Sequence, residues 1–158
     1  MIALRDEGKI GAIGVSAVPE GVVRRALPAG IVCVQNAYSL LDRSQERRSS
    51  SVRPKALPGC RTSRSALPYR CSPSVTDNPE VVSVAGEIGA TPAQVGLAWL
   101  LAHSPNTLLI PGTRSPAHLD ENIAVGAMTL PPEAIARLDA VPSVPLPSGV
   151  EAFLDAED

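Results

Sequence analysis

The sequence predicts an α/β fold in which helices alternate with the strands of a parallel sheet. Three short apolar runs, at residues 9–15, 31–35 and 108–110, have the length of a buried strand and carry no charge beyond Lys9. Apolar residues with helical spacing follow the first run, at 19–27, so the chain begins with strand, helix and strand. This unit predicts parallel strands, because a helix between two strands lets the second run in the same direction as the first.

The composition limits the possible functions. With 158 residues, 44% of them hydrophobic, the chain is long enough for one modest domain with a core. The net charge of -2 gives no strong attraction to nucleic acid or to an anionic membrane, and no apolar run approaches the ~20 residues of a membrane span. We therefore expect neither partner. The cysteines lack metal-ligand spacing, so we expect reduced thiols, no metal site and a cytoplasmic protein; they are Cys33, Cys60 and Cys71.

The first unit opens with a short helix. Residues 1–7 are typical of the last turns of a helix, and Gly8 is suited to end it. The strand at 9–15 follows. The helix at 19–27 has apolar side chains on one side and two arginines near its C-terminal end, and the strand at 31–35 completes the unit.

Polar side chains stand where these two strands end. Ser16 follows the first strand, and Gln35 and Asn36 end the second. In parallel barrels the carboxyl ends of the strands carry the ligand. From the residues alone, two interpretations are open: these side chains line a ligand site, or they are loop residues that bind only water.

Residues 44–77 break this pattern. The interval 47–75 holds seven basic residues and no acid, and four prolines divide it into pieces too short to build a core. We expect an irregular segment without a helix or strand. It is a basic tether for phosphates or nucleic acid, a genuine insertion, or a translated reading-frame error in a GC-rich gene. We favour the last as a hypothesis, which sequencing of the gene tests.

The helical pattern then returns. A helix is predicted at 79–88 and ends at Gly89. Thr91-Pro92-Ala93-Gln94 is a capping box with proline at the first helical position, and it opens a helix that is apolar on all sides. That helix is expected to be buried, with Trp99 as a core residue. A last helix starts within 130–133.

The third strand runs directly into a helix start. Leu108 to Ile110 end at Pro111-Gly112, and Ser115 is suited to cap a helix whose first residue is Pro116. Arg114 stands in the turn. Free backbone N–H groups and the helix dipole favour an anion there. Local residues alone leave two interpretations, a phosphate site or an ordinary connection with a surface arginine.

The residue pattern Ile-Pro-Gly-Thr-Arg-Ser-x-x-His-Leu-x-Glu-Asn at 110–122 resembles the C-terminal cofactor signature of the aldo/keto reductase family. Residues 8–16 and 34–43 resemble that family's fifth and sixth barrel strands. Residues 91–101 are similar to its Thr-Pro-Ala-Gln-Val-x-Leu-Ala-Trp-Leu-Leu helix. Each motif is weak alone, but together they are specific.

The resemblance implies an α/β fold that is the second half of a (β/α)8 TIM barrel, with parallel strands and outer helices. Strands five, six and eight are recognisable, in one partial-barrel domain over 1–43 and 78–141. Residues 44–77 remain irregular, and 142–158 form a C-terminal tail. A complete barrel needs ~250 residues, so this chain would be a fragment of one.

The resemblance also implies NADPH as the cofactor. In the family, the serine after Gly-Val and the glutamine of the sixth strand bond the nicotinamide carboxamide, and here these are Ser16 and Gln35. The family commonly has asparagine after that serine, whereas this chain has Ala17, so one contact is missing or made by the backbone. In the family, the segment that corresponds to 110–122 binds the adenosine end and 2′-phosphate of NADPH. Its cofactor-binding residues would be Gly112, Thr113, Arg114, His118, Glu121 and Asn122.

Members of the family reduce aldehydes and ketones by hydride transfer from NADPH. Their acid is a tyrosine supported by lysine, aspartate and histidine, all from the first half of the barrel. No residue here takes those roles, so none is predicted to be catalytic.

We therefore expect the cofactor-binding portion of a reductase, which would act on a small-molecule carbonyl substrate only when completed by an N-terminal half. The alternative is a non-catalytic remnant or binding module with weak dinucleotide affinity. A half barrel leaves two open sheet edges, so self-association is also expected.

Overall fold

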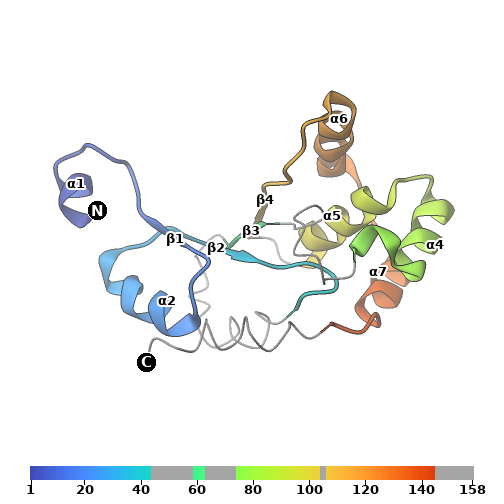
Figure 1. The fold of residues 1–158 in the computed structure, drawn as a ribbon, viewed down its shortest axis with the longest axis horizontal. Coiled ribbons are helices and arrows are strands. Elements are labelled where there is room, and N and C mark those ends of the chain that lie inside the picture. Colours follow the sequence, from blue (N-terminus) through green and yellow to red (C-terminus); the bar gives the residue numbers. More distant parts are fainter. Residues whose placement is uncertain (44–58, 63–73, 104–105, 145–158) are drawn as a thin grey trace.

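The computed structural model describes residues 1–43, 59–62, 74–103 and 106–144, and one parallel sheet lies at its centre (Figure 1). The strands are β1 (Gly14–Ser16), β2 (Cys33–Ala37), β3 (Gly59–Thr62) and β4 (Thr107–Leu109), and they lie in that order. Each neighbouring pair is parallel. The predicted α/β fold with a parallel sheet is confirmed.

Strand β3 corrects the sequence-based expectation. The sequence predicts no strand within 44–77, yet β3 pairs on both sides, with Cys60 in register with Gln35 of β2 and with Leu108 of β4. Backbone hydrogen bonds to two neighbours hold a strand whose own residues show no apolar alternation. The stretches that flank β3 lie outside the described residues.

The two outer strands are more exposed than their apolar runs predict, and β1 is also shorter than its run. β1 contains only the end of the 9–15 run together with Ser16, and its residues Gly14 and Ser16 are exposed. In β4, Leu108 is 58% exposed. Within the described ranges, each outer strand has a strand neighbour on one side only. The prediction of buried strands is therefore wrong at Gly14 and Leu108, because composition does not tell where in a sheet a strand lies.

Helices account for most of the remaining described residues. The α-helices are α1 (Ile2–Asp6), α2 (Glu20–Ala26), α4 (Pro79–Ile88), α5 (Pro92–His103), α6 (Pro116–Ala124) and α7 (Pro132–Asp139). Short 3-10 helices are η1 (Leu27–Ala29), η2 (Val75–Asp77) and η3 (Val125–Ala127). In the described part of the chain, no helix has the length and apolar character needed to cross a membrane.

The helix ends follow from local capping. Asn78 Oδ1 accepts hydrogen bonds from two backbone N–H groups at the start of α4, and Gly89 ends that helix with a φ of 68°. At the start of α5, the Gln94 N–H donates to Thr91 Oγ1 and the Thr91 N–H donates to Gln94 Oε1. The predicted capping box is thereby confirmed.

Buried side chains form two clusters. The larger joins α4, α5 and α7 to the segment after β2, and it contains Trp99 at 1% exposure, as predicted. The smaller packs Val23 of α2 against Ile13 and Ile31, which precede β1 and β2. In Figure 1, α1 and α2 lie at one end of the sheet, whereas α4, α5 and α7 gather at the other.

Candidate functional site

Ser16 and Gln35 lie side by side at the carboxyl edge of the sheet. Their Cα atoms are partners in the parallel β1–β2 ladder, so their side chains leave the same face. The ladder continues one residue further, where the Ala17 N–H donates to Gln35 O at 2.8 Å. Ser16 is exposed and Gln35 is half-buried. The pair presents a hydroxyl and an amide, and these groups can donate and accept hydrogen bonds to one carboxamide.

Asn36 ties down the loop that follows Ser16. Its Nδ2 donates to Val18 O at 3.0 Å, and its Oδ1 accepts from the Val18 N–H at 3.2 Å. Between Ser16 and Val18, Ala17 has a φ of 53°, a left-handed conformation that alanine rarely adopts. The sequence marks Asn36 only as a polar residue at a strand end. The sequence signal that could have indicated its structural role is the presence of a second amide side chain, next to Gln35, in an otherwise apolar strand.

The turn after β4 has the predicted strand-to-helix form. Helix α6 begins at Pro116, and Ser115 Oγ accepts a hydrogen bond from the His118 N–H at 3.4 Å. Thr113 Oγ1 accepts from the Ser115 N–H at 3.1 Å, which closes the turn around Arg114. The Arg114 side chain is exposed. The turn therefore presents a guanidinium beside a capped helix start, where the dipole adds positive potential.

The Arg114 turn and the Ser16–Gln35 pair leave the same edge of the sheet. β4 runs parallel to β3, β3 to β2 and β2 to β1, so all carboxyl ends lie on one side. Gly112 is exposed and Thr113 is half-buried in the segment that leads from β4 to α6, a path that Figure 1 shows. The topology brings these predicted site segments to one edge.

The other predicted residues lie along α6. His118 is exposed, whereas Glu121 and Asn122 are half-buried. Gln94 Nε2 donates to Glu121 O at 3.1 Å, which fixes α6 to the start of α5. The three side chains follow the Arg114 turn on one helix at three- and four-residue spacing. Their contact with a cofactor stays a prediction.

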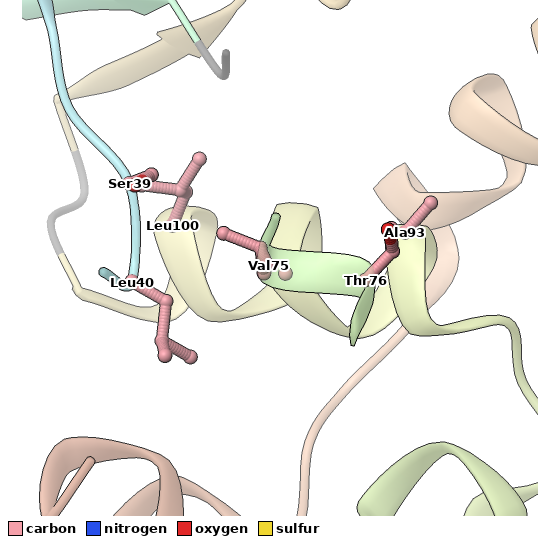
Figure 2. A pocket seen from close by; sticks show the side chains of 7 residues that line it. Ser39, Leu40, Val75, Thr76, Ala93 and Leu100 are labelled. Atoms are coloured by element: carbon pink, nitrogen blue, oxygen red, sulfur yellow. The ribbon is translucent and has the colours of Figure 1, made fainter. Parts of the chain in front are cut away.

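A small cavity lies away from this edge, where η2 and α5 meet the segment after β2. Figure 2 shows Ser39 and Leu40 on one side and Val75 and Thr76 of η2 on the other, with Leu100 of α5 between them. Its volume of about 10 Å³ has room for one water molecule at most. It is a packing defect of the larger core, and a dinucleotide cannot enter it.

The aromatic residues beside the larger core join structural elements. Tyr38 is 3% exposed, and its ring centroid lies 5.9 Å from that of Trp99. His103 stacks on Trp99 at 4.8 Å, and the Arg43 guanidinium carbon lies 4.8 Å from the centre of the Trp99 ring. Arg43 also donates to the carbonyls of Leu138 and Asp139 at the end of α7. These contacts hold α5, α7 and the segment after β2 together.

The described ranges contain no candidate metal-binding site. Among these residues, no group of three or more histidine, cysteine, aspartate or glutamate side chains lies close enough together to hold an ion. The candidate site at the carboxyl edge of the sheet is built from hydroxyl, amide and guanidinium groups.

Comparisons with known proteins point to one family. The model of the aldo/keto reductase family matches residues 45–142, a range that includes the basic segment for which the sequence predicts no regular structure. Pyridoxine 4-dehydrogenase from Escherichia coli is 36% identical over 141 residues, which cover 87% of this chain and 47% of the relative. An uncharacterized oxidoreductase from Schizosaccharomyces pombe is 31% identical over 143 residues, 87% of this chain and 44% of the relative.

Solved structures agree in fold. A thermostable aldo-keto reductase crystallised with the inhibitor epalrestat superposes with a TM-score of 0.73 at 29% identity, over 87% of this chain and 51% of the other. The aldose reductase from Schistosoma japonicum superposes with a TM-score of 0.68 at 22% identity, over 87% of this chain and 43% of the other. This chain spans about half the length of the curated relatives it matches.

Proposed function

This chain belongs to the aldo/keto reductase family, and we propose that it supplies the NADPH-binding part of a carbonyl reductase. Solved members of the family are TIM barrels. In this proposal β1, β2 and β4 are the fifth, sixth and eighth barrel strands. β3 lies between β2 and β4, and so it takes the place of the seventh.

The observation that carries the proposal is the shared edge at which Ser16, Gln35 and the Arg114 turn leave the sheet. A nicotinamide carboxamide needs one donor and one acceptor, and the adjacent hydroxyl and amide of Ser16 and Gln35 fit that need. The exposed Arg114 guanidinium fits a phosphate, which it can bind through two parallel hydrogen bonds. The site thus has complementary groups for both ends of a dinucleotide.

The remaining predicted residues fit the adenosine end. Gly112 and Thr113 form the approach from β4 to α6, while His118, Glu121 and Asn122 follow on the helix. The proposed preference for NADPH over NADH rests on Arg114, because only NADPH carries the 2′-phosphate that a guanidinium would bind. The compartment in which the protein acts is proposed to be the cytoplasm, in line with the reduced thiols expected from its sequence.

Bound NADPH supplies the hydride, and this chain's residues orient it. Ser16 and Gln35 would hold the carboxamide and so set which face of the ring points toward a substrate. The proton that completes carbonyl reduction must come from an acid, and none of the described side chains at the carboxyl edge is a candidate. We propose that the acid comes from a complementary half barrel, which also provides most of the surface that selects the substrate.

Two sheet edges in the described structure would receive such a half. β1 and β4 each have a strand neighbour on one side only, so their outer N–H and C=O groups can pair with further strands. Leu108 is 58% exposed and Ile110 is 39% exposed on and just beyond β4. Apolar side chains at an open edge favour association, either with the complementary half or between copies of this chain.

A fluorescence titration with NADPH, paired with an aldehyde reduction assay, tests the proposal. The chain alone is expected to bind NADPH in a saturable manner and to turn over at least about 10²-fold more slowly than a full-length relative, because the general acid is missing. Absence of saturable binding would contradict the cofactor role and favour a non-catalytic remnant. Turnover equal to that of a full-length relative would contradict the need for another half.

A further inference from the structure

We infer that Asn36 is a positioning residue, which holds the loop after β1 in the conformation that points Ser16 at the nicotinamide end of the cofactor. The inference rests on the proposed dinucleotide site and adds to it a residue that need not touch the cofactor. The side-chain amide of Asn36 lies against the backbone of Val18.

The Asn36 side chain makes a two-way pairing with one residue. Its Nδ2 donates to Val18 O at 3.0 Å and its Oδ1 accepts from the Val18 N–H at 3.2 Å. An amide side chain has the same donor and acceptor as a peptide group, so it can take the place of a neighbouring strand. The β1–β2 ladder is thereby extended past the last strand residue by a side chain.

The loop needs such support because its backbone is strained. Ala17 has a φ of 53°, a conformation in which the Cβ atom comes too close to the following carbonyl oxygen. Two contacts hold Ala17 in place: its own N–H donates to Gln35 O at 2.8 Å, and the next residue is paired with Asn36. Strain of this kind persists only where the surroundings determine the conformation.

Neighbouring residues of β2 thus have separate tasks. Successive side chains of a strand point to opposite faces, so Gln35 lies on the face of Ser16 and Asn36 on the other. Gln35 lies beside Ser16 in the ladder, while Asn36 fixes the backbone that follows Ser16. Without the Val18 pairing, the loop would relax toward an unstrained φ and change the direction of the Ser16 hydroxyl.

Two substitutions remove the hydrogen bonds between Asn36 and Val18 to different extents. Asn36→Asp keeps the acceptor for the Val18 N–H and loses the donor to Val18 O, whereas Asn36→Leu loses both. The affinities for NADPH and for 2′,5′-ADP are measured by titration, because the second ligand has the adenosine and phosphate groups but no nicotinamide. Asn78→Asp is the matched control, since Asn78 acts as an acceptor at the start of α4 and aspartate retains that role.

We expect Asn36→Leu to raise the Kd for NADPH about tenfold, which corresponds to the loss of about one or two hydrogen bonds. Asn36→Asp should have a smaller effect in the same direction and keeps the test open if the leucine variant does not fold. Neither variant should change the Kd for 2′,5′-ADP by more than about twofold. Asn78→Asp should change neither affinity.

Each remaining outcome is decisive. Equal losses of affinity for both ligands would show that Asn36 supports the whole fold, and they would overturn the inference, as would unchanged NADPH affinity in both variants. If the unaltered chain binds neither ligand, the proposed function itself fails, and the inference falls with it. The first two outcomes leave the proposed function intact, so the two failures are distinguishable.

Discussion

The indole Nε1 of Trp99 donates a hydrogen bond to Asp139 Oδ1 at 2.8 Å, and this contact joins the middle of α5 to the end of α7. Trp99 is 1% exposed, so its ring is enclosed while its N–H reaches a surface carboxylate. The same ring lies under Arg43, which donates to the carbonyls at the end of α7. One aromatic side chain thus connects two helices and the segment after β2.

Trp99→Phe is expected to destabilise the chain by about 1–3 kcal/mol, because it removes this hydrogen bond and leaves part of the indole volume empty. Urea unfolding, monitored by circular dichroism, gives the change in the free energy of unfolding. Asp139→Asn keeps an oxygen that can accept the hydrogen bond and should cost less than about 1 kcal/mol. An equal loss in the two variants would contradict the importance of the enclosed ring.

Arg137 of α7 binds two carboxylates of α4, and these ion pairs make the stability of the fold depend on pH. Its Nε donates to Glu80 at 2.5 Å and its Nη1 donates to Glu87 at 2.7 Å. The hydrogen bond from Arg137, and then that from Ser83, lower the pKa of Glu87 from its ordinary value of 4.5. A lowered pKa in the folded state means that ionised Glu87 stabilises the fold above pH 4.5, and that this contribution is lost as the pH falls through the lowered value.

Melting temperatures of the unaltered chain and Glu87→Gln, measured from pH 7 down to about pH 3, test this sign. The unaltered chain should melt at the higher temperature at neutral pH, and the difference should shrink as the pH falls below 4.5. Because these groups are exposed to solvent, salt should also reduce the difference. A difference that grows with acidification would contradict the prediction.

Arg114→Ala tests the proposed phosphate contact. The variant should bind NADPH about tenfold or more weakly and NADH almost unchanged, because a charge-assisted hydrogen bond is worth roughly 1.5–3 kcal/mol and only NADPH has the 2′-phosphate. Fluorescence titrations with both cofactors supply the comparison. Arg25→Ala is the control, since Arg25 is also exposed but lies in the last turn of α2. Equal weakening of both cofactors by Arg114→Ala would contradict a 2′-phosphate contact.

The strained Ala17 leads to a stabilising substitution. Ala17→Gly should raise the free energy of unfolding by up to about 1 kcal/mol, because glycine adopts a φ of 53° without a Cβ penalty. Ala136→Gly is a control of opposite sign: Ala136 is an exposed residue inside α7, where glycine should cost roughly 0.5–1 kcal/mol. Urea unfolding measures both. Destabilisation by Ala17→Gly would show that the left-handed conformation carries no strain.

The sequence predicts those parts of the fold that depend on contacts between residues close together in the chain. Ser115 caps α6, Thr91 and Gln94 cap α5, and Gly89 ends α4, because each of these contacts lies within one turn of the chain. The apolar character of α5 likewise predicts that Trp99 is buried. Such signals need no knowledge of the rest of the molecule.

Contacts between distant residues explain what the sequence does not reveal. β3 is a strand because β2 and β4 flank it, although Gly59 to Thr62 have no strand-like pattern. The exposure of Leu108 follows from the position of β4 at the edge of the sheet. The pairing of Asn36 with Val18 joins residues 18 positions apart. The resemblance to the family predicts the site residues, and their contact with a cofactor stays a prediction.

Hydrogen–deuterium exchange with and without NADPH tests the central claim most directly, since it reports on each segment of the backbone. If Ser16, Gln35 and the Arg114 turn form one dinucleotide site, NADPH should slow exchange at residues 15–18, 34–37 and 110–122 together. Exchange in α4 and α7 should stay unchanged. Slowing at only one of the three segments, or none at all with saturating NADPH, would contradict the claim.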